Sequence, residues 1–234
     1  MYQLTCKKLL IVSLIAFSSN IVAVNFWEYV EQLLPDEPVL LEAGAHNGSD
    51  TVAMAKRFKN GQIFAFEPVP YLYNQVIEKT RNFPNAHCYQ LALNDQCGTA
   101  EFYVSSGLSD GAGSLLTPSL TLSSLLLNDT RLHFDQVIQV KTITLDEWAK
   151  NEGITNIDFM WLDLQGSEPD VLMASPIIFQ TVKVVFTEVN YKPLYQGAIL
   201  YPEFKDWMIS QGFSAILEAG AGYPGQKNIL FVRR

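Results

Sequence analysis

The chain has 234 residues, of which 48% are hydrophobic and 17% are charged. This composition provides for one α/β domain with a sizeable core and excludes an intrinsically disordered chain. The formal net charge is -8, and Lys and Arg form no cluster of the kind that binds phosphate groups. We therefore expect no nucleic-acid partner.

The amino-terminal segment is predicted to be a separate unit. Lys7 and Lys8 precede an apolar stretch over residues 9–17, and Ala23 offers a small residue at which a leader could be cleaved. Residues 1–23 are therefore predicted to be a signal peptide or a membrane anchor, with membrane association through residues 9–24; an apolar helix packed on the domain is the alternative. Residues 24–234 are expected to form a single domain.

Two cysteines remain in that domain, Cys88 and Cys97. They could form a disulfide in an oxidising compartment, although the sequence alone favours two buried thiols.

The most informative stretch of the sequence lies at residues 39–50. A short apolar run over residues 39–41 is followed by Glu42, Gly44 and Gly48, and then by apolar residues at helical spacing. This pattern predicts a strand, a tight loop and the start of a helix. Glycine permits the positive φ of such a loop, and the first turn of a helix offers unpaired N–H groups to bound polar atoms. The loop is thus predicted to cradle a nucleotide-like ligand.

Strands and helices alternate after this loop, which predicts a parallel sheet with right-handed crossovers. The expected helices end at residue 58 or span 70–81, 145–151 and 201–211, and the expected strands span 62–66, 87–93, 99–104, 136–142, 157–162 and 182–186. Residues 213–217 and 229–232 are expected to form an antiparallel strand pair. An insertion is expected over about residues 105–135, and its Gly- and Ser-rich part over 105–114 is predicted to be an active-site loop or a connector.

Polar side chains follow several of the predicted parallel strands. Because the carboxyl ends of such strands meet at one edge of a sheet, these side chains should gather around one crevice. They are Glu42, Glu67, Asn94, Asp163 and Glu188. Glu67 stands about 20 residues beyond the glycine loop, which is the spacing at which an acid after the second strand binds ribose hydroxyls.

The loop differs from a dinucleotide fingerprint, since His46 stands where that fingerprint has its central glycine. A pyrophosphate would also meet the nearby carboxylate of Glu42, whereas a cationic sulfonium or amino group would not. The sequence therefore favours S-adenosylmethionine over NAD.

In their order and spacing, these fragments resemble the FkbM-type methyltransferase family over about residues 36–232. The matching fragments are residues 42–48, 66–68, 91–98, 144–147, 157–168 and 187–189. The resemblance implies a class I methyltransferase fold, which is Rossmann-like and doubly wound, with a mostly parallel sheet and an antiparallel strand pair at its carboxyl-terminal end. It also implies an S-adenosylmethionine-dependent methyltransferase that acts on a hydroxyl group of a small molecule or glycan. Trp161 and Gln165 stand where many members have lysine and glutamate.

By position, the resemblance places Gly44, His46, Gly48 and Asp50 around the methionine part of the cofactor, Glu67 at the ribose, and Asn94 with Asp95 on the adenine side. The full predicted cofactor-binding set is Glu42, Gly44, His46, Asn47, Gly48, Asp50, Glu67, Asn94, Asp95 and Asp163.

Methyl transfer to a hydroxyl requires alignment of donor and acceptor and a group that takes the hydroxyl proton. Asp163 is the first candidate for this general base, Glu188 the second and His46 the third. Each also has a structural interpretation: Asp163 could cap the following helix, Glu188 could pair with Lys192, and His46 could shape the loop.

Two other functions stay open. A catalytically silent, methyltransferase-like binding protein would explain a leader that exports the chain from the cytosol, where the cofactor is made. A dinucleotide oxidoreductase is disfavoured by the missing central glycine. His87 and His133 have no partners at metal-ligand spacing, so no metal is expected.

Overall fold

The computed structural model describes residues 26–107, 109–120, 122, 132–220 and 224–234. The chain divides into two compact units, with the boundary between Leu33 and Leu34. In the first unit, α2 (Phe26–Glu31) buries Val30. The predicted leader over residues 1–23 lies outside the described residues. Within the described ranges, no helix is long and apolar enough to cross a membrane.

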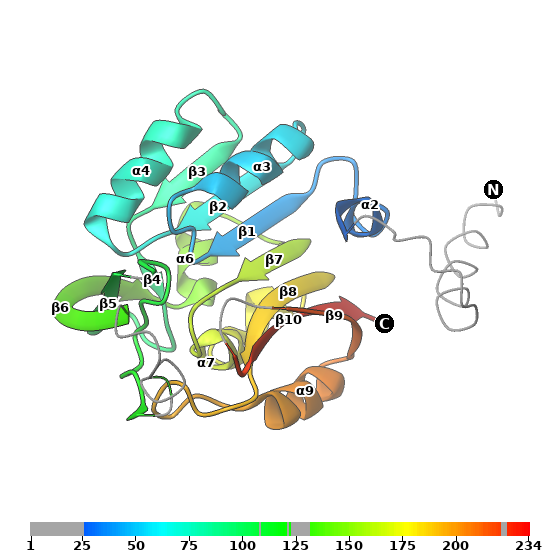
Figure 1. Ribbon diagram of the computed structural model, residues 1–234. Coiled ribbons are helices and arrows are strands. Elements are labelled where there is room, and N and C mark those ends of the chain that lie inside the picture. The colour runs from blue at the N-terminus through cyan, green and yellow to red at the C-terminus, as the bar shows by residue number, and fades with distance from the viewer. Residues whose placement is uncertain (1–25, 108, 121, 123–131, 221–223) are drawn as a thin grey trace, which may run out of the picture. The chain divides into compact units, whose positions relative to one another are not determined.

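The second unit is built on a seven-stranded sheet with the strand order β3-β2-β1-β7-β8-β10-β9 (Figure 1). The strands from β3 to β8 pair in parallel, and β10 is antiparallel to both of its neighbours, β8 and β9. This arrangement confirms the predicted mostly parallel sheet with an antiparallel strand pair at its carboxyl-terminal end. The strands are β1 (Val39–Ala43), β2 (Gln62–Phe66), β3 (Ala86–Tyr89), β7 (Phe159–Leu162), β8 (Val184–Asn190), β9 (Phe213–Gly220) and β10 (Gln226–Arg233).

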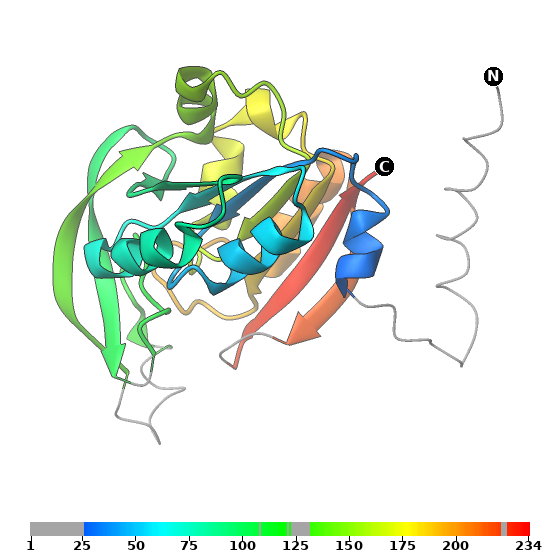
Figure 2. The same ribbon diagram turned by 90° about the horizontal axis from the view of Figure 1, so that it is seen from above.

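Helices cover both faces of this sheet, as expected of a doubly wound fold (Figure 2). One face carries α3 (Ser49–Arg57) and α4 (Pro70–Thr80), and the other carries α6 (Leu145–Glu152), α7 (Glu168–Met173), α8 (Pro176–Phe179) and α9 (Tyr201–Ser210). On the second face, Trp148, Phe179 and Phe204 pack with strand residues such as Leu41 and Phe66 in the main hydrophobic core.

Both ends of α6 are capped. The backbone N–H of Glu147 donates to Oγ1 of Thr144 at 3.2 Å, and the helix ends at Gly153, which has a φ of 69°. Both ends of this helix therefore follow from local residue chemistry.

A second, three-stranded sheet has the order β4-β6-β5 and stands beyond the carboxyl ends of β1, β2 and β7 (Figures 1 and 2). It consists of β4 (Ala92–Leu93), β5 (Gly98–Gly107) and β6 (Leu132–Ile143). Phe102, Val104 and Val140 of this sheet pack against Val69 and Leu72 at the start of α4. The second sheet therefore builds a wall over the edge where ligands of α/β sheets bind.

This sheet corrects two expectations. The strand expected over residues 87–93 is divided, because the chain leaves the main sheet after Tyr89, and Ala92 and Leu93 pair with Thr142 and Ile143 instead. Asn94 and Asp95 therefore follow β4 and not the main-sheet strand β3. The two strands that flank the insertion expected over about residues 105–135 are also longer than the predicted 99–104 and 136–142, since β5 continues to Gly107 and β6 begins at Leu132. Within the insertion, residues 108, 121 and 123–131 lie outside the described ranges.

Candidate functional site

A pocket lies at the carboxyl ends of β1, β2 and β7, and residues of β5 and of the segment 109–115 form its outer wall. The polar residues that line it are His46, Asn47, Ser49, Asp50, Glu67, Ser105, Asp110, Asp163 and Ser167. Apolar residues line the rest of the pocket, among them Phe66, Leu91, Leu93 and Phe102.

The loop between β1 and α3 is fixed by backbone contacts. The N–H groups of Gly44 and Ala45 both donate to the carbonyl of Phe66, at 3.0 and 2.9 Å. Gly44 has a φ of +87°, and a Cβ atom at this position would lie 2.0 Å from the carbonyl oxygen of Asp163. A side chain is excluded both by backbone conformation and by space, so glycine allows the ends of β1, β2 and β7 to meet closely.

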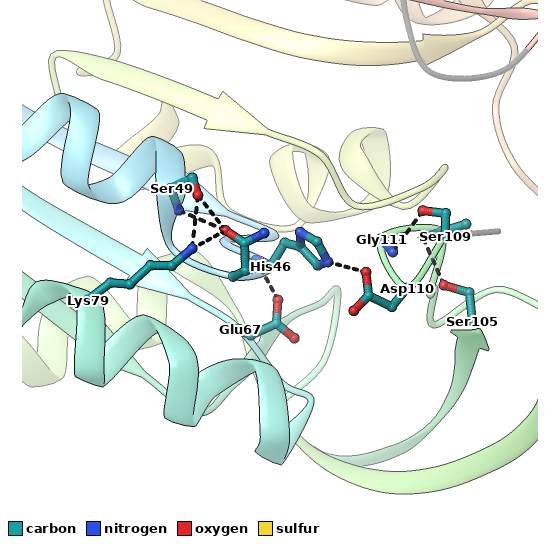
Figure 3. A network of polar contacts seen from close by, with 10 residues as sticks. His46, Ser49, Glu67, Lys79, Ser105, Ser109, Asp110 and Gly111 are labelled. Carbon is teal, nitrogen blue, oxygen red and sulfur yellow. Dashed lines mark hydrogen bonds and ion pairs between the residues drawn. The ribbon is translucent and has the colours of Figure 1, made fainter. Parts of the chain in front are cut away.

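Glu67 supports the same loop from the end of β2. Its Oε2 accepts a hydrogen bond from the backbone N–H of His46 at 2.8 Å (Figure 3), and its Oε1 accepts one from the N–H of Val69 at 2.9 Å. Burial raises the pKa of Glu67 to about 7, although the two backbone N–H groups act in the opposite direction. Each carboxylate oxygen has a second lone pair, which leaves it able to accept a further hydrogen bond from a ligand.

His46 joins the loop to the outer wall of the pocket. This residue has a φ of 50°, which is unusual for a residue other than glycine, and its Nε2 lies 2.7 Å from Oδ1 of Asp110 (Figure 3). Nearby, Nζ of Lys79 donates to Oδ1 of Asn47 at 2.8 Å and to Oγ of Ser49 at 3.0 Å. Asp110 was not predicted as a site residue, and its only signal in the sequence is its place in the Gly- and Ser-rich segment over residues 105–114.

Asp163 lies at the carboxyl end of β7, and its carboxyl group accepts a hydrogen bond from the side-chain amide of Gln165. Nε2 of Gln165 donates to Oδ1 of Asp163 at 2.7 Å and to Oε2 of Glu188 at 2.8 Å. Burial raises the pKa of Glu188 to about 10, and the nearby Asp163 and Glu168 add to this shift. Glu188 is thus a neutral carboxylic acid at pH 7.

Two further buried carboxyl groups, those of Glu42 and Glu168, accept hydrogen bonds near the pocket. The hydroxyl of Thr51 donates to Oε2 of the buried Glu42, whose pKa is raised well above its ordinary value by burial. The two oxygens of Glu168 accept hydrogen bonds from the N–H groups of Leu164 and Gly166 at 2.7 and 2.9 Å, and burial raises the pKa of Glu168 to about 8.

The pocket brings together only part of the predicted site. The residues Gly44, His46, Asn47, Asp50, Glu67 and Asp163 line it. Glu42, Gly48, Asn94, Asp95 and Glu188 are not among its lining residues. Leu91, Ala92 and Leu93, which directly precede Asn94 and Asp95 in the chain and were not predicted to belong to the site, line the pocket instead.

Among the described residues, no group of three or more His, Cys, Asp or Glu is arranged to hold a metal ion. Cys88 and Cys97 are free thiols, the first half-buried and the second exposed.

Comparison with known proteins agrees with this geometry. A family model, described as the methyltransferase FkbM domain, matches residues 42–215. The 2-O-methyltransferase NoeI of Sinorhizobium fredii is 29% identical over 177 residues, which cover 74% of this chain and 71% of that protein. Methyltransferase sdnD of Sordaria araneosa is 25% identical over 232 residues, which cover 86% of this chain and 83% of that protein.

Among solved structures, the fibrillarin pre-rRNA processing protein of Methanococcus jannaschii has a similar fold, with a TM-score of 0.52 and 11% identity over 86% of this chain and 68% of that chain. The family model spans most of the chain and includes the loop after β1, the acid after β2 and the loop after β7. The chain therefore belongs to the FkbM methyltransferase family and is an S-adenosylmethionine-dependent methyltransferase.

Proposed function

We propose that this enzyme methylates an oxygen atom, in a hydroxyl group of a small molecule or glycan, and that the pocket at the carboxyl ends of β1, β2 and β7 is where donor and acceptor meet. The observation that carries the proposal is the convergence of the Gly44 loop, Glu67 and Asp163 on one pocket from three adjacent parallel strands. The printed name of NoeI, a 2-O-methyltransferase, supports oxygen as the acceptor atom.

The lining of the pocket fits a cationic methyl donor. The acidic residues that line it are Asp50, Glu67, Asp110 and Asp163, and no Lys or Arg is among the described residues that line it. When bound, S-adenosylmethionine supplies an electrophilic methyl group on a positively charged sulfur. Carboxyl groups favour such a charge and disfavour phosphate or carboxylate groups on the acceptor. We accordingly expect an acceptor that is neutral or cationic near its hydroxyl.

Residues of the pocket can be assigned to parts of the donor. Gly44, His46, Asn47 and Asp50 would surround the methionine part, and Glu67 would accept hydrogen bonds from the ribose hydroxyls. The apolar side chains of residues 91–93 would face the adenine in place of Asn94 and Asp95, which do not line the pocket.

Asp163 is the proposed general base, because it lines the pocket and offers a carboxylate there. As the acceptor oxygen forms its bond to the methyl carbon and the carbon–sulfur bond breaks, the hydroxyl proton would pass to Asp163. His46 also lines the pocket and is the alternative base, with Asp110 to orient its ring. Glu188 stays a weaker candidate, since it does not line the pocket.

The experiment is transfer of an isotopically labelled methyl group to a panel of hydroxylated acceptors, with wild type, Asp163→Ala and Glu67→Ala. We expect Asp163→Ala to abolish transfer while donor binding falls less than it does in Glu67→Ala. Undiminished transfer in Asp163→Ala would refute its role as base. A folded wild-type protein that binds the donor but methylates no acceptor would favour the catalytically silent relative.

A further inference from the structure

A buried amide lies behind the proposed base. Gln165 is 4% exposed and has a φ of 53°. Its side-chain nitrogen donates to two carboxyl groups, Oδ1 of Asp163 at 2.7 Å and Oε2 of Glu188 at 2.8 Å. One NH₂ group therefore connects a pocket residue to a buried acid, and both of its hydrogens are used.

The side-chain oxygen of Gln165 also has hydrogen-bonding partners. Nε2 of Gln226 donates to Oε1 of Gln165 at 3.3 Å and to Oε2 of Glu188 at 2.6 Å. The hydroxyl of Tyr195 lies 2.8 Å from the same Oε1 and 2.8 Å from the carbonyl of Ala112. A flipped amide would place its carbonyl oxygen against Oδ1 of Asp163 and Oε2 of Glu188, so these two carboxyl groups favour the orientation in which nitrogen faces Asp163.

The backbone around Gln165 is also held. Its carbonyl accepts a hydrogen bond from Oγ of Ser114 at 3.0 Å, and Glu168 binds the N–H groups of the residues on either side, Leu164 and Gly166. Because backbone and side chain are both fixed, the amide cannot follow Asp163 if that carboxylate turns.

The surroundings of Asp163 are mostly acidic. The titratable groups that act on it or are affected by it are His46, Glu42, Asp50, Glu67, Glu168 and Glu188. Burial raises the pKa of Asp163, and the hydrogen bond from Gln165 is the largest influence that lowers it. A glutamate at position 165 would instead add another acid between Asp163 and Glu188.

We propose that Gln165 is the positioning residue of Asp163: its amide holds Oδ1 of the carboxylate and leaves Oδ2 to receive the proton of the acceptor hydroxyl. This inference rests on the proposed role of Asp163 as general base. The second hydrogen of the amide keeps the neutral acid Glu188 bound away from the pocket.

The test measures the titration of Asp163 directly and requires no acceptor. The carboxyl carbon of Asp163 is followed by ¹³C NMR in the full chain, assigned by its loss in Asp163→Asn, for wild type, Gln165→Met and Gln226→Met. Gln165→Met should raise the titration midpoint of Asp163 by about one to two pH units, because the carboxylate loses a hydrogen bond to its charged form. Gln226→Met removes a donor to Glu188 and one to the amide oxygen of Gln165 but none to Asp163, so it should move that midpoint by less than Gln165→Met does. An unchanged midpoint in Gln165→Met would overturn the proposal.

A second measurement needs no substitution that could prevent folding. In wild-type protein, the side-chain amide signal of Gln165 in ¹⁵N–¹H spectra should shift with the same midpoint as the Asp163 carboxyl carbon. An amide signal that does not move through that titration would also overturn the proposal. Failure of the proposed function has a different signature, which is full methyl transfer by Asp163→Asn whatever the two titrations show.

Discussion

At the residue scale, the acids of the site differ in what they contact. Asp163 lines the pocket, whereas Glu188 is 6% exposed and its Oε2 accepts hydrogen bonds from the amides of Gln165 and Gln226. A glutamine at position 188 can accept both of these hydrogen bonds through its own carbonyl oxygen. The two acids should therefore respond differently to replacement by their amides.

We predict that Glu188→Gln keeps methyl transfer and changes the free energy of unfolding by less than about 1.5 kcal/mol, because the acid it replaces is already neutral at pH 7. Asp163→Asn should lose transfer by about 100-fold or more. Labelled methyl transfer and urea unfolding measure the two effects. Equal loss of transfer in both variants would show that Glu188 takes part in the chemistry.

The close approach at Gly44 gives a second prediction at this scale. Gly44→Ala should destabilise the protein by more than about 2 kcal/mol, because it combines an unfavourable φ with a clash against the carbonyl of Asp163. Gly153→Ala is the matched control, since Gly153 also has a positive φ of 69° but has no atom within 4 Å of a built Cβ. It should cost only about 1 kcal/mol. If urea unfolding gives equal losses for the two variants, the close contact at Gly44 is not important for stability.

At the scale of elements, the outer wall of the pocket depends on a segment without regular structure. The N–H of Ala112 donates to Oγ of Ser105 at 2.9 Å, and backbone hydrogen bonds join Tyr103 to Ser114 at 2.9 and 3.1 Å. These contacts hold the segment 109–115 against β5, which places Asp110 opposite His46.

Ser105→Ala should therefore loosen the wall, because it leaves the buried N–H of Ala112 without this acceptor, at a cost of about 1 to 3 kcal/mol. Hydrogen exchange of the Ala112 amide should accelerate together with the loss of stability. Ser106→Ala is the control, since Ser106 is the exposed neighbour on the same strand and should leave both quantities unchanged. Unchanged exchange in Ser105→Ala would mean that other contacts hold the wall.

The elements also show how far the sequence could predict this molecule. Apolar runs and glycines predicted the parallel strands, the loop at Gly44 and the closing antiparallel pair, because these depend on local pattern. The division of the strand expected over 87–93 could not be predicted, since both halves are similarly apolar and only pairing with β6 separates them. The contact of Asp110 with His46 and the amide of Gln165 were missed for the same reason: they join residues far apart in the sequence.

At the scale of the whole molecule, several buried acids should give stability an unusual dependence on pH. Burial raises the pKa of Glu67 to about 7 and that of Glu168 to about 8, from an ordinary value of 4.5. Between pH 4.5 and the raised pKa of each group, the folded protein keeps a proton on that group that the unfolded chain has released. The free energy of unfolding should therefore fall as the pH rises through this range.

We expect these two acids together to lower the free energy of unfolding by roughly 6 kcal/mol between pH 5 and pH 8, at about 1.4 kcal/mol for each pKa unit. Urea unfolding at a series of pH values measures it. Glu188→Gln should reduce the slope, because it removes a further acid whose pKa is raised, in this case to about 10. Stability that increases steadily over the same range would contradict the assignment of these acids as neutral in the folded protein.

The pocket with Glu67 at the end of β2 should bind the methyl donor. Calorimetric titration of the full chain with S-adenosylmethionine measures this binding, with wild type, Glu67→Ala and Asp163→Asn compared under the same conditions. We predict binding to wild type, a loss of affinity of about tenfold or more in Glu67→Ala, and a smaller loss in Asp163→Asn. A folded wild-type protein that does not bind the donor, or a Glu67→Ala variant that binds it as tightly as wild type, would show that this pocket is not the donor site.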